Sequence, residues 1–237
     1  MEWLNSWWAD VYEQIYATFV EGDRWQYLVK GIGNTIQIAF FAVLLGIVIG
    51  VIVALIKVFT AGNKKFRWLE IIANIYLTVI RGTPMLVQLF IMYYIVITSP
   101  NVSKIFVSIL AFGINSGAYV AEVARSGIQS IDKGQMEAGR SLGLNRAQTM
   151  VKIIFPQALK NILPALGNEF ITMLKETSVA GFIGVEELTK VGDILRSQTW
   201  QPYVPLFSVA LVYLIMVVGL TRLLGVLERR LRRSDYR

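Results

Sequence analysis

The chain has 237 residues, of which 55% are hydrophobic and only 16% charged, and its mean hydropathy is +0.55. A soluble domain carries about 25% charged residues, so the composition indicates an integral membrane protein. Cysteine and histidine are absent, which excludes disulfide frameworks, Cys/His metal sites and catalysis by either side chain. The net charge of +7 is more typical of loops facing an anionic membrane leaflet than of nucleic-acid binding.

The first ten residues, MEWLNSWWAD, are acidic and aromatic and lack a basic n-region, so we do not expect a cleavable signal peptide. Trp3, Trp7 and Trp8 favour a short amphipathic segment at the membrane interface. We assign residues 1–30 to this segment.

Five apolar segments are long enough to cross a bilayer core, which takes about 20 residues. The second is too long for one straight span and is interrupted by Arg81-Gly82-Thr83-Pro84. In the third, Asn115-Ser116-Gly117 is expected to form a similar interruption. The sequence therefore predicts an all-α membrane protein with five transmembrane helices, at about residues 33–56, 68–97, 105–124, 161–183 and 203–224.

The distribution of Lys and Arg predicts the orientation, because cytoplasmic loops carry an excess of both. With the N-terminus outside and the C-terminus cytoplasmic, the outer segments hold five, namely Arg24, Lys30, Lys104, Lys190 and Arg196. The inner segments then hold fifteen: Lys57, Lys64, Lys65, Arg67, Arg125, Lys133, Arg140, Arg146, Lys152, Lys160, Arg229, Arg230, Arg232, Arg233 and Arg237.

A polar, basic stretch, EAGRSLGLNRAQTMVKIIFP from Glu137 to Pro156, lies between the third and fourth segments. The pattern predicts two short helices around a turn at Gly143-Leu144-Asn145, with Ala138, Leu142 and Ala147 on one side. We expect Glu137 to stabilise the N-terminus of the first helix through the dipole, and Pro156 to end the pair. A solvated loop that only satisfies the positive-inside rule is the alternative.

The spacing of this stretch resembles the EAA signature of ABC-importer permeases: Glu137-Ala138-Gly139, then Gly143, then Ile153 and Phe155-Pro156. Gly139 and Phe155 stand where the family has Ala and Leu. Further segments resemble those of polar amino-acid permeases (the histidine/glutamine/arginine permease family): RGTPMLVQ from Arg81, GAYVAEVARSGI from Gly117, LKETS from Leu174 and IGVEEL from Ile183.

The resemblance implies a type I ABC importer (MetI-like) core at residues 31–226, with a cytoplasmic coupling loop at 130–157 and a basic tail at 227–237. It implies a multi-pass permease subunit of the bacterial plasma (inner) membrane, not an enzyme, that imports polar amino acids by alternating access. The residues expected to couple it to the ATPase are Glu137, Ala138, Gly139, Arg140, Leu142, Gly143, Leu144 and Pro156.

The expected partners follow from the same resemblance. The chain has no G-x-x-x-x-G-K-[ST] loop, so we expect no cofactor of its own, and two separate ATP-binding subunits would hold ATP and Mg²⁺. A second copy of the chain would complete a homodimer, although a different permease could pair with it instead. A substrate-binding protein would dock on the outer face.

Broken helices and charges within spans point to the transport site, since both are costly in a membrane. The candidates are Arg81, Thr83, Gln88, Asn115, Tyr119, Glu122 and Glu169. Close helix packing is the alternative for the small residues, and pairing with Arg125 or the coupling loop is the alternative for Glu122. Helix rise places Arg81 and Glu169 at similar depths, roughly 16 and 12 Å from the inner edge, so an ion pair between them competes with a ligand role for Glu169.

A carboxylate in the cavity would suit an ammonium or guanidinium group, so basic amino acids (arginine, lysine, histidine) or glutamine are the expected substrates. Two other classes remain open from the sequence: a secondary transporter driven by H⁺ or Na⁺, and a channel-like or scaffold membrane protein.

Overall fold

The computed structural model describes residues 2–60 and 64–233, and this part of the chain is helical, with no strand. Short π- and 3-10 helices occupy Tyr16–Val20, Glu21–Asp23, Lys64–Phe66, Met92–Val96, Met150–Ile154 and Thr177–Ile183. The α-helices are α1 (Glu2–Ile15), α2 (Trp25–Thr60), α3 (Arg67–Gly82), α4 (Met85–Ile91), α5 (Lys104–Gln129), α6 (Lys133–Ser141), α7 (Arg146–Thr149), α8 (Phe155–Glu176), α9 (Leu188–Thr199) and α10 (Tyr203–Arg233).

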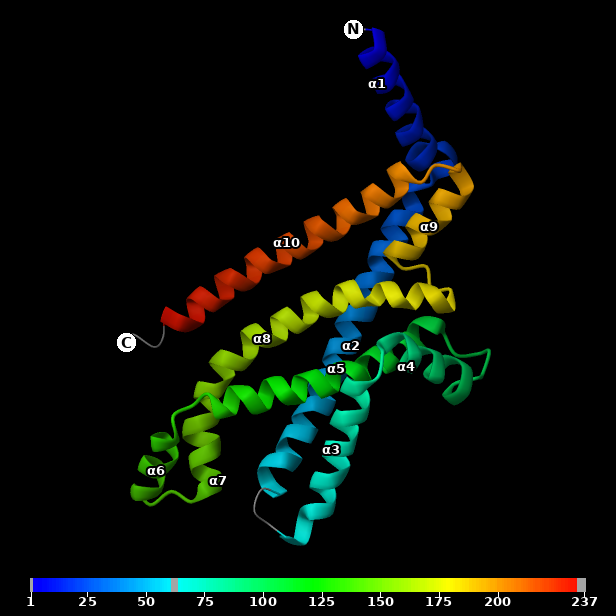
Figure 1. Cartoon of the computed structure of the whole chain (residues 1–237). Coiled ribbons are helices and arrows are strands. Elements are labelled where there is room, and N and C mark those ends of the chain that lie inside the picture. The colour runs from blue at the N-terminus through cyan, green and yellow to red at the C-terminus, as the bar shows by residue number, and fades with distance from the viewer. Residues whose placement is uncertain (1, 61–63, 234–237) are drawn as a thin grey trace.

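Four glycines bring α2 and α5 together where the two helices cross (Figure 1). Gly46 and Gly50 on α2, like Gly113 and Gly117 on α5, are four residues apart and so share a helix face. A Cβ atom added to Gly113 would lie 2.6 Å from the Leu45 side chain. Small residues at this spacing allow helix backbones to approach closely in a membrane, and here they let α2 and α5 pack tightly.

Three single helices among the described residues are long and apolar enough to cross a membrane: α2 over Trp25–Val58, α5 over Lys104–Gln129 and α10 over Tyr203–Arg230. A fourth candidate is the pair Arg67–Gly82 and Met85–Val96, bent by 110° at its break. The predicted interruption of the second segment is thus confirmed. Helix α8 is not among these candidates, so the count of five spans and their orientation stay predictions.

Helix α5 runs unbroken through Asn115-Ser116-Gly117, so the predicted interruption there was wrong. Asn115 and Ser116 are buried, and their side chains bond to neighbouring helices while the helical backbone continues. Gly117 is a packing position, because an added Cβ would lie 2.7 Å from the Tyr76 hydroxyl. That hydroxyl donates a hydrogen bond to the Ile114 carbonyl at 2.6 Å. The small polar residues therefore allow close helix contact.

Pro156 does not end the short helices before the fourth segment, contrary to the prediction. It lies in the first turn of α8, and the π-helix Met150–Ile154 joins α7 to α8 with helical backbone at both junctions. Proline lacks an N–H group and its ring clashes with the carbonyl four residues back, but near the start of α8, directly after the wider π turn, both effects can be accommodated within a continuing helix. Helices α7 and α8 consequently form one helical rod with the π-helix between them.

The two ends of the molecule differ: α1 and α9 lie at one end and α6 and α7 at the other (Figure 1). At the α9 end, the Lys30 ammonium lies 2.6 Å from the Glu186 carboxylate, which ties α2 to the segment before α9. Trp8 is exposed, as an interfacial segment would require, whereas the side chains of Trp3 and Trp7 lie outside the described residues. Helix α10 extends to Arg233, so it includes the start of the expected tail. The domain boundaries stay predictions.

Candidate functional site

A row of polar side chains follows one face of α5 at the centre of the molecule. Asn115, Tyr119 and Glu122 are four and three residues apart, which places them on the same side of the helix. The other candidates come from α3 and its end, α4 and α8, and hydrogen bonds or ion pairs connect these elements to α5. The fold therefore brings candidate residues from α3, the end of α3, α4 and α8 close to α5.

The Gln88 side chain forms hydrogen bonds across the break between α3 and α4. Its side-chain amide donates to the Ile80 carbonyl at 2.7 Å and lies 3.1 Å and 2.8 Å from the Thr83 carbonyl and hydroxyl oxygens. Its carbonyl oxygen accepts a hydrogen bond from Asn115 at 3.0 Å. Because of Pro84 and the bend, the Ile80 and Thr83 carbonyls have no helical N–H donor, and the Gln88 amide donates to them instead. In this conformation Thr83, Gln88 and Asn115 thus stabilise the bent helix pair.

Arg81 and Glu122 form the charged part of the row. The Glu122 carboxylate lies 2.7 Å from the Arg125 guanidinium and 3.8 Å from that of Arg81, and Arg81 also stands 5.8 Å from the centroid of the Tyr119 ring. The predicted alternative of an Arg81–Glu169 ion pair was therefore wrong, whereas pairing of Glu122 with Arg125 is confirmed. Depth alone misled the prediction, because α3 packs against α5, which carries Glu122, whereas Glu169 lies on α8.

Glu169 on α8 accepts a hydrogen bond from the Ser116 hydroxyl at 2.9 Å. The carboxylate is partly buried, and among the described residues no lysine or arginine forms an ion pair with it. Burial makes a carboxylate without a cationic partner costly, and two oxygens offer more acceptor sites than one hydroxyl fills. The arrangement is suited to receive a cationic group.

The loop between α5 and α8 forms the expected two short helices. Asp132 caps α6 by accepting a hydrogen bond from the Gly134 amide at 2.6 Å. Glu137 is the fifth residue of α6, so it does not stabilise the helix N-terminus as predicted; Asp132 takes that position. Arg140 lies in the last turn, where a cation favours the helix dipole.

Gly143 makes the turn between α6 and α7. Its φ of +86° lies in the left-handed region that favours glycine. The amides of Gly143 and Leu144 donate to the carbonyls of Arg140 and Gly139, the Schellman pattern that ends a helix. Asn145 and Gln148 then cap α7 reciprocally, with both hydrogen bonds at 2.9 Å.

The turn presents an apolar surface outward, which we call the loop face: Ala138, Leu142 and Ala147, all exposed. Leu142 is 81% exposed, an unusual state for a leucine held in a well-capped turn. Gly139 instead faces inward, since an added Cβ would lie 2.4 Å from the Thr149 Cγ2 atom. Glycine in place of the family's alanine thus lets α6 pack against a β-branched residue.

The loop is fastened to the transport helices at its base. The Asn161 amide donates to the Ser130 hydroxyl at 2.9 Å, which joins α8 to the residue after α5. An added Cβ on Gly127 would lie 2.4 Å from Ile162, so the two helices touch there. Continuous helical backbone therefore joins α7 to α8, which carries Glu169.

Sequence reasoning missed four contributing residues: Ser116 as the partner of Glu169, Asp132 as the cap of α6, and the Asn145–Gln148 pair. The spacing Asn-x-x-Gln is a capping-box signal and Asp132 stands at a helix start, so both caps could have been found. No local signal points from Ser116 to Glu169, because 53 residues separate them.

The family described as binding-protein-dependent transport system inner membrane component matches residues 46–233. The chain belongs to this family. A solved structure of an amino acid ABC transporter with histidines matches this binding-protein-dependent permease with a TM-score of 0.80 and 42% identity, over 86% of this chain and 94% of that one. The type I importer (MetI-like) fold and the location as a multi-pass inner membrane protein are thereby confirmed.

Two curated relatives extend the comparison. A putative glutamine transport system permease protein of Rickettsia bellii is 37% identical over 210 residues, which cover 86% of this permease and 93% of the relative. An arginine transport system permease protein of Bacillus subtilis is 33% identical over 211 residues, covering 88% and 94%. Membership in a binding-protein-dependent system decides against the ion-coupled and channel-like alternatives, and this family works with ATP-binding subunits and a substrate-binding protein.

Proposed function

We propose that the chain is the membrane permease of an ATP-driven importer for polar amino acids, with a preference for cationic ones. The observation that carries this preference is Glu169, a partly buried carboxylate that accepts from a serine hydroxyl and has no ion-pair partner within residues 2–60 and 64–233. Relatives whose names specify glutamine and arginine transport support the substrate class.

The substrate's ammonium or guanidinium group would pair with Glu169, between α8 and α5. The Arg81 guanidinium, near Tyr119 and 45% exposed, would receive the substrate's carboxylate. Moving from Glu122 to the substrate costs Arg81 little, because its 3.8 Å pair is loose and Arg125 remains with Glu122. Both charged ends of an amino acid would then be held at the polar centre.

Energy would enter through the α6–α7 loop. Two ATP-binding subunits, which bind ATP and Mg²⁺ in place of this chain, would dock on the loop faces of two copies in a homodimer. Their closure would move α7, and the continuous rod would carry this motion to Glu169 and open the site to alternate sides. We propose that the loop is cytoplasmic, that the substrate-binding protein docks at the α9 end, and that the chain itself catalyses no reaction.

The test is uptake by the reconstituted complex carrying Glu169→Gln. We expect uptake of arginine and lysine to fall at least tenfold, because the amide cannot balance a buried cation, while glutamine uptake falls less than threefold. The tenfold loss corresponds to about 1.4 kcal/mol. Glu13→Gln, an exposed carboxylate on α1, is the matched control and should affect the substrates equally. An equal loss for all three substrates in Glu169→Gln would refute the ligand role.

A further inference from the structure

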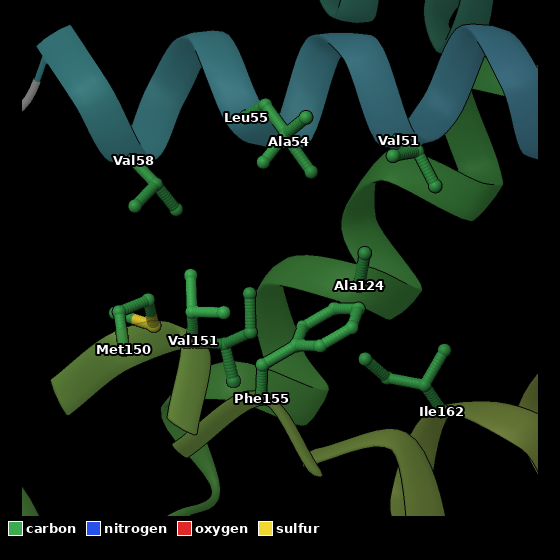
Figure 2. A pocket seen from close by; sticks show the side chains of 10 residues that line it. Val51, Ala54, Leu55, Val58, Ala124, Met150, Val151, Phe155 and Ile162 are labelled. Carbon is green, nitrogen blue, oxygen red and sulfur yellow. The ribbon is translucent and has the colours of Figure 1, made fainter. Parts of the chain in front are cut away.

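An apolar cavity of about 220 Å³ opens between α2 and the helical rod of the loop (Figure 2). Val51, Leu55 and Val58 of α2 form one wall, and Val151 and Phe155 of the rod form the opposite wall. The side chains from the two walls point toward one another across an open space in Figure 2. Ala124 of α5 contributes to the lining, which exposes no polar atom.

Such a cavity does not suit water or a polar solute. Water in a protein interior needs two to four polar partners, and an apolar cavity of about 150 Å³ stays dry yet binds hydrocarbon. The present cavity is larger and offers no hydrogen-bond partner. An apolar occupant is therefore favoured.

An exposed apolar stripe leads along α2 to the cavity. Phe41, Leu44, Val48, Val51 and Leu55 are spaced by three or four residues, so they lie on one face, and each is 43–53% exposed. The stripe spans roughly 21 Å of helix, which exceeds half of the roughly 30 Å hydrocarbon core. Because α2 is long and apolar enough to cross a membrane, hydrocarbon would cover this surface, and the cavity continues it.

We propose that an acyl chain of a membrane phospholipid binds here, with its first methylenes in the cavity and its remainder along the stripe. Lys152 follows the cavity residue Val151 and is exposed, so its ammonium group can reach a phosphate at the interface. A second protein chain would also bury apolar surface. A lipid, in addition, matches the layout of the stripe: it begins near the middle of α2, where an acyl chain would end, and leads to the cavity near Lys152, where a phosphate would lie.

The bound chain would act on coupling because of its position. One wall of the cavity belongs to α2, which is packed firmly on α5, and the other to the rod that links α7 with α8. An acyl chain between them fills the space into which the rod could otherwise move. Lipid occupancy thus sets the resting position of the rod.

Photolabelling of the assembled transporter in nanodiscs tests the proposal. Phosphatidylglycerol would carry a diazirine near the carboxyl end of one acyl chain or at its methyl end, and mass spectrometry would locate the labels. The proximal probe should label peptides containing Leu55 and Val151, and the distal probe those containing Leu44. Val151→Trp, which fills the cavity from an exposed position, should lower proximal labelling of Leu55 at least fivefold and leave Leu44 unchanged.

Leu214→Trp on the exposed face of α10 is the matched control and should leave the Leu55 label unchanged. Val58→Phe serves as a second filling variant if Val151→Trp does not assemble. Proximal labelling of Leu55 no stronger than that of Leu214, or unaffected by both filling variants, would overturn the proposal. Because the chain has no cysteine, Leu55→Cys gives a further check: a disulfide-linked pair of permeases would assign the cavity to a second copy.

Discussion

The polar centre and the α6–α7 loop are built in opposite ways. In the centre, hydrogen bonds join residues far apart in the sequence, as between Gln88 and Asn115 or Ser116 and Glu169. In the loop the hydrogen bonds that cap the helices are local, as between Asn145 and Gln148, and the apolar Leu142 points outward. In the centre the polar side chains bond to one another, and the Glu169 carboxylate has acceptor sites left for a small ligand. In the loop the helix ends are capped locally, and an exposed apolar surface is left for a partner subunit.

The largest expected effect concerns the packing inside the loop. Gly139→Ala would place a methyl group against the Thr149 Cγ2 atom, and such overpacking costs typically 1–3 kcal/mol. We expect ATP-dependent uptake to fall at least tenfold in proteoliposomes while the complex still assembles. Adding Thr149→Ala removes both Cγ2 and Oγ1, which would lie 2.4 Å and 2.9 Å from the new methyl group, so the double variant should recover most of the activity. Failure of Thr149→Ala to restore uptake would contradict this packing.

The next prediction concerns the polar centre, where loss of one side chain should lower the thermal stability of the chain. Gln88→Met keeps the volume of the side chain but leaves the Ile80 and Thr83 carbonyls and the Asn115 amide without their partner. Unsatisfied buried groups cost about 1–3 kcal/mol each. We expect a clear drop in the thermal midpoint of the purified chain, measured in detergent, with Gln198→Met at an exposed position of α9 as the control. An unchanged midpoint would show that the bend does not depend on Gln88.

Leu142→Ala should show the reverse behaviour. The side chain is 81% exposed, so the free energy of unfolding should change by no more than about 0.5 kcal/mol. An apolar anchor at a partner interface costs about 1–2 kcal/mol or more when truncated, so binding to the ATP-binding subunit should weaken at least fivefold. Titration of the detergent-solubilised subunits would measure this. Unaltered affinity would argue that the partner docks elsewhere.

The two regions also differed in how far the sequence revealed them. The loop followed from local signals, since the glycine turn and the spacing around it need no distant contact to be recognised. The bend at Pro84 was predicted for the same reason. The partners in the centre were not: depth suggested an Arg81–Glu169 pair as an alternative, but α3 packs against α5 and Arg81 lies near Glu122. Asn115-Ser116-Gly117 was taken for a break because composition does not show that a partner satisfies each polar side chain.

The smallest expected effect lies at the α9 end. Burial raises the pKa of the Glu187 carboxyl above its ordinary value, although the amides of Thr189 and Lys190 donate to it. The unfolded chain therefore loses this proton at a lower pH than the folded chain, and the stability due to the neutral form is lost as pH rises above about 4.3. The thermal midpoint of the wild type, measured relative to that of Glu187→Gln, should decrease as the pH is raised from 4 to 7. A difference that stays constant over this range would contradict the direction of the shift.

We infer that ATP-binding subunits outside this chain drive amino-acid transport through the polar centre by acting on the α6–α7 loop. Uptake of labelled arginine into proteoliposomes that contain the permease, its ATP-binding subunits and the substrate-binding protein tests it most directly. Uptake should require ATP on the side of the loop, and Gly139→Ala should abolish most of it while the ATP-binding subunits remain bound. Arginine accumulation that continues without ATP, or that is indifferent to the loop variant, would contradict the account.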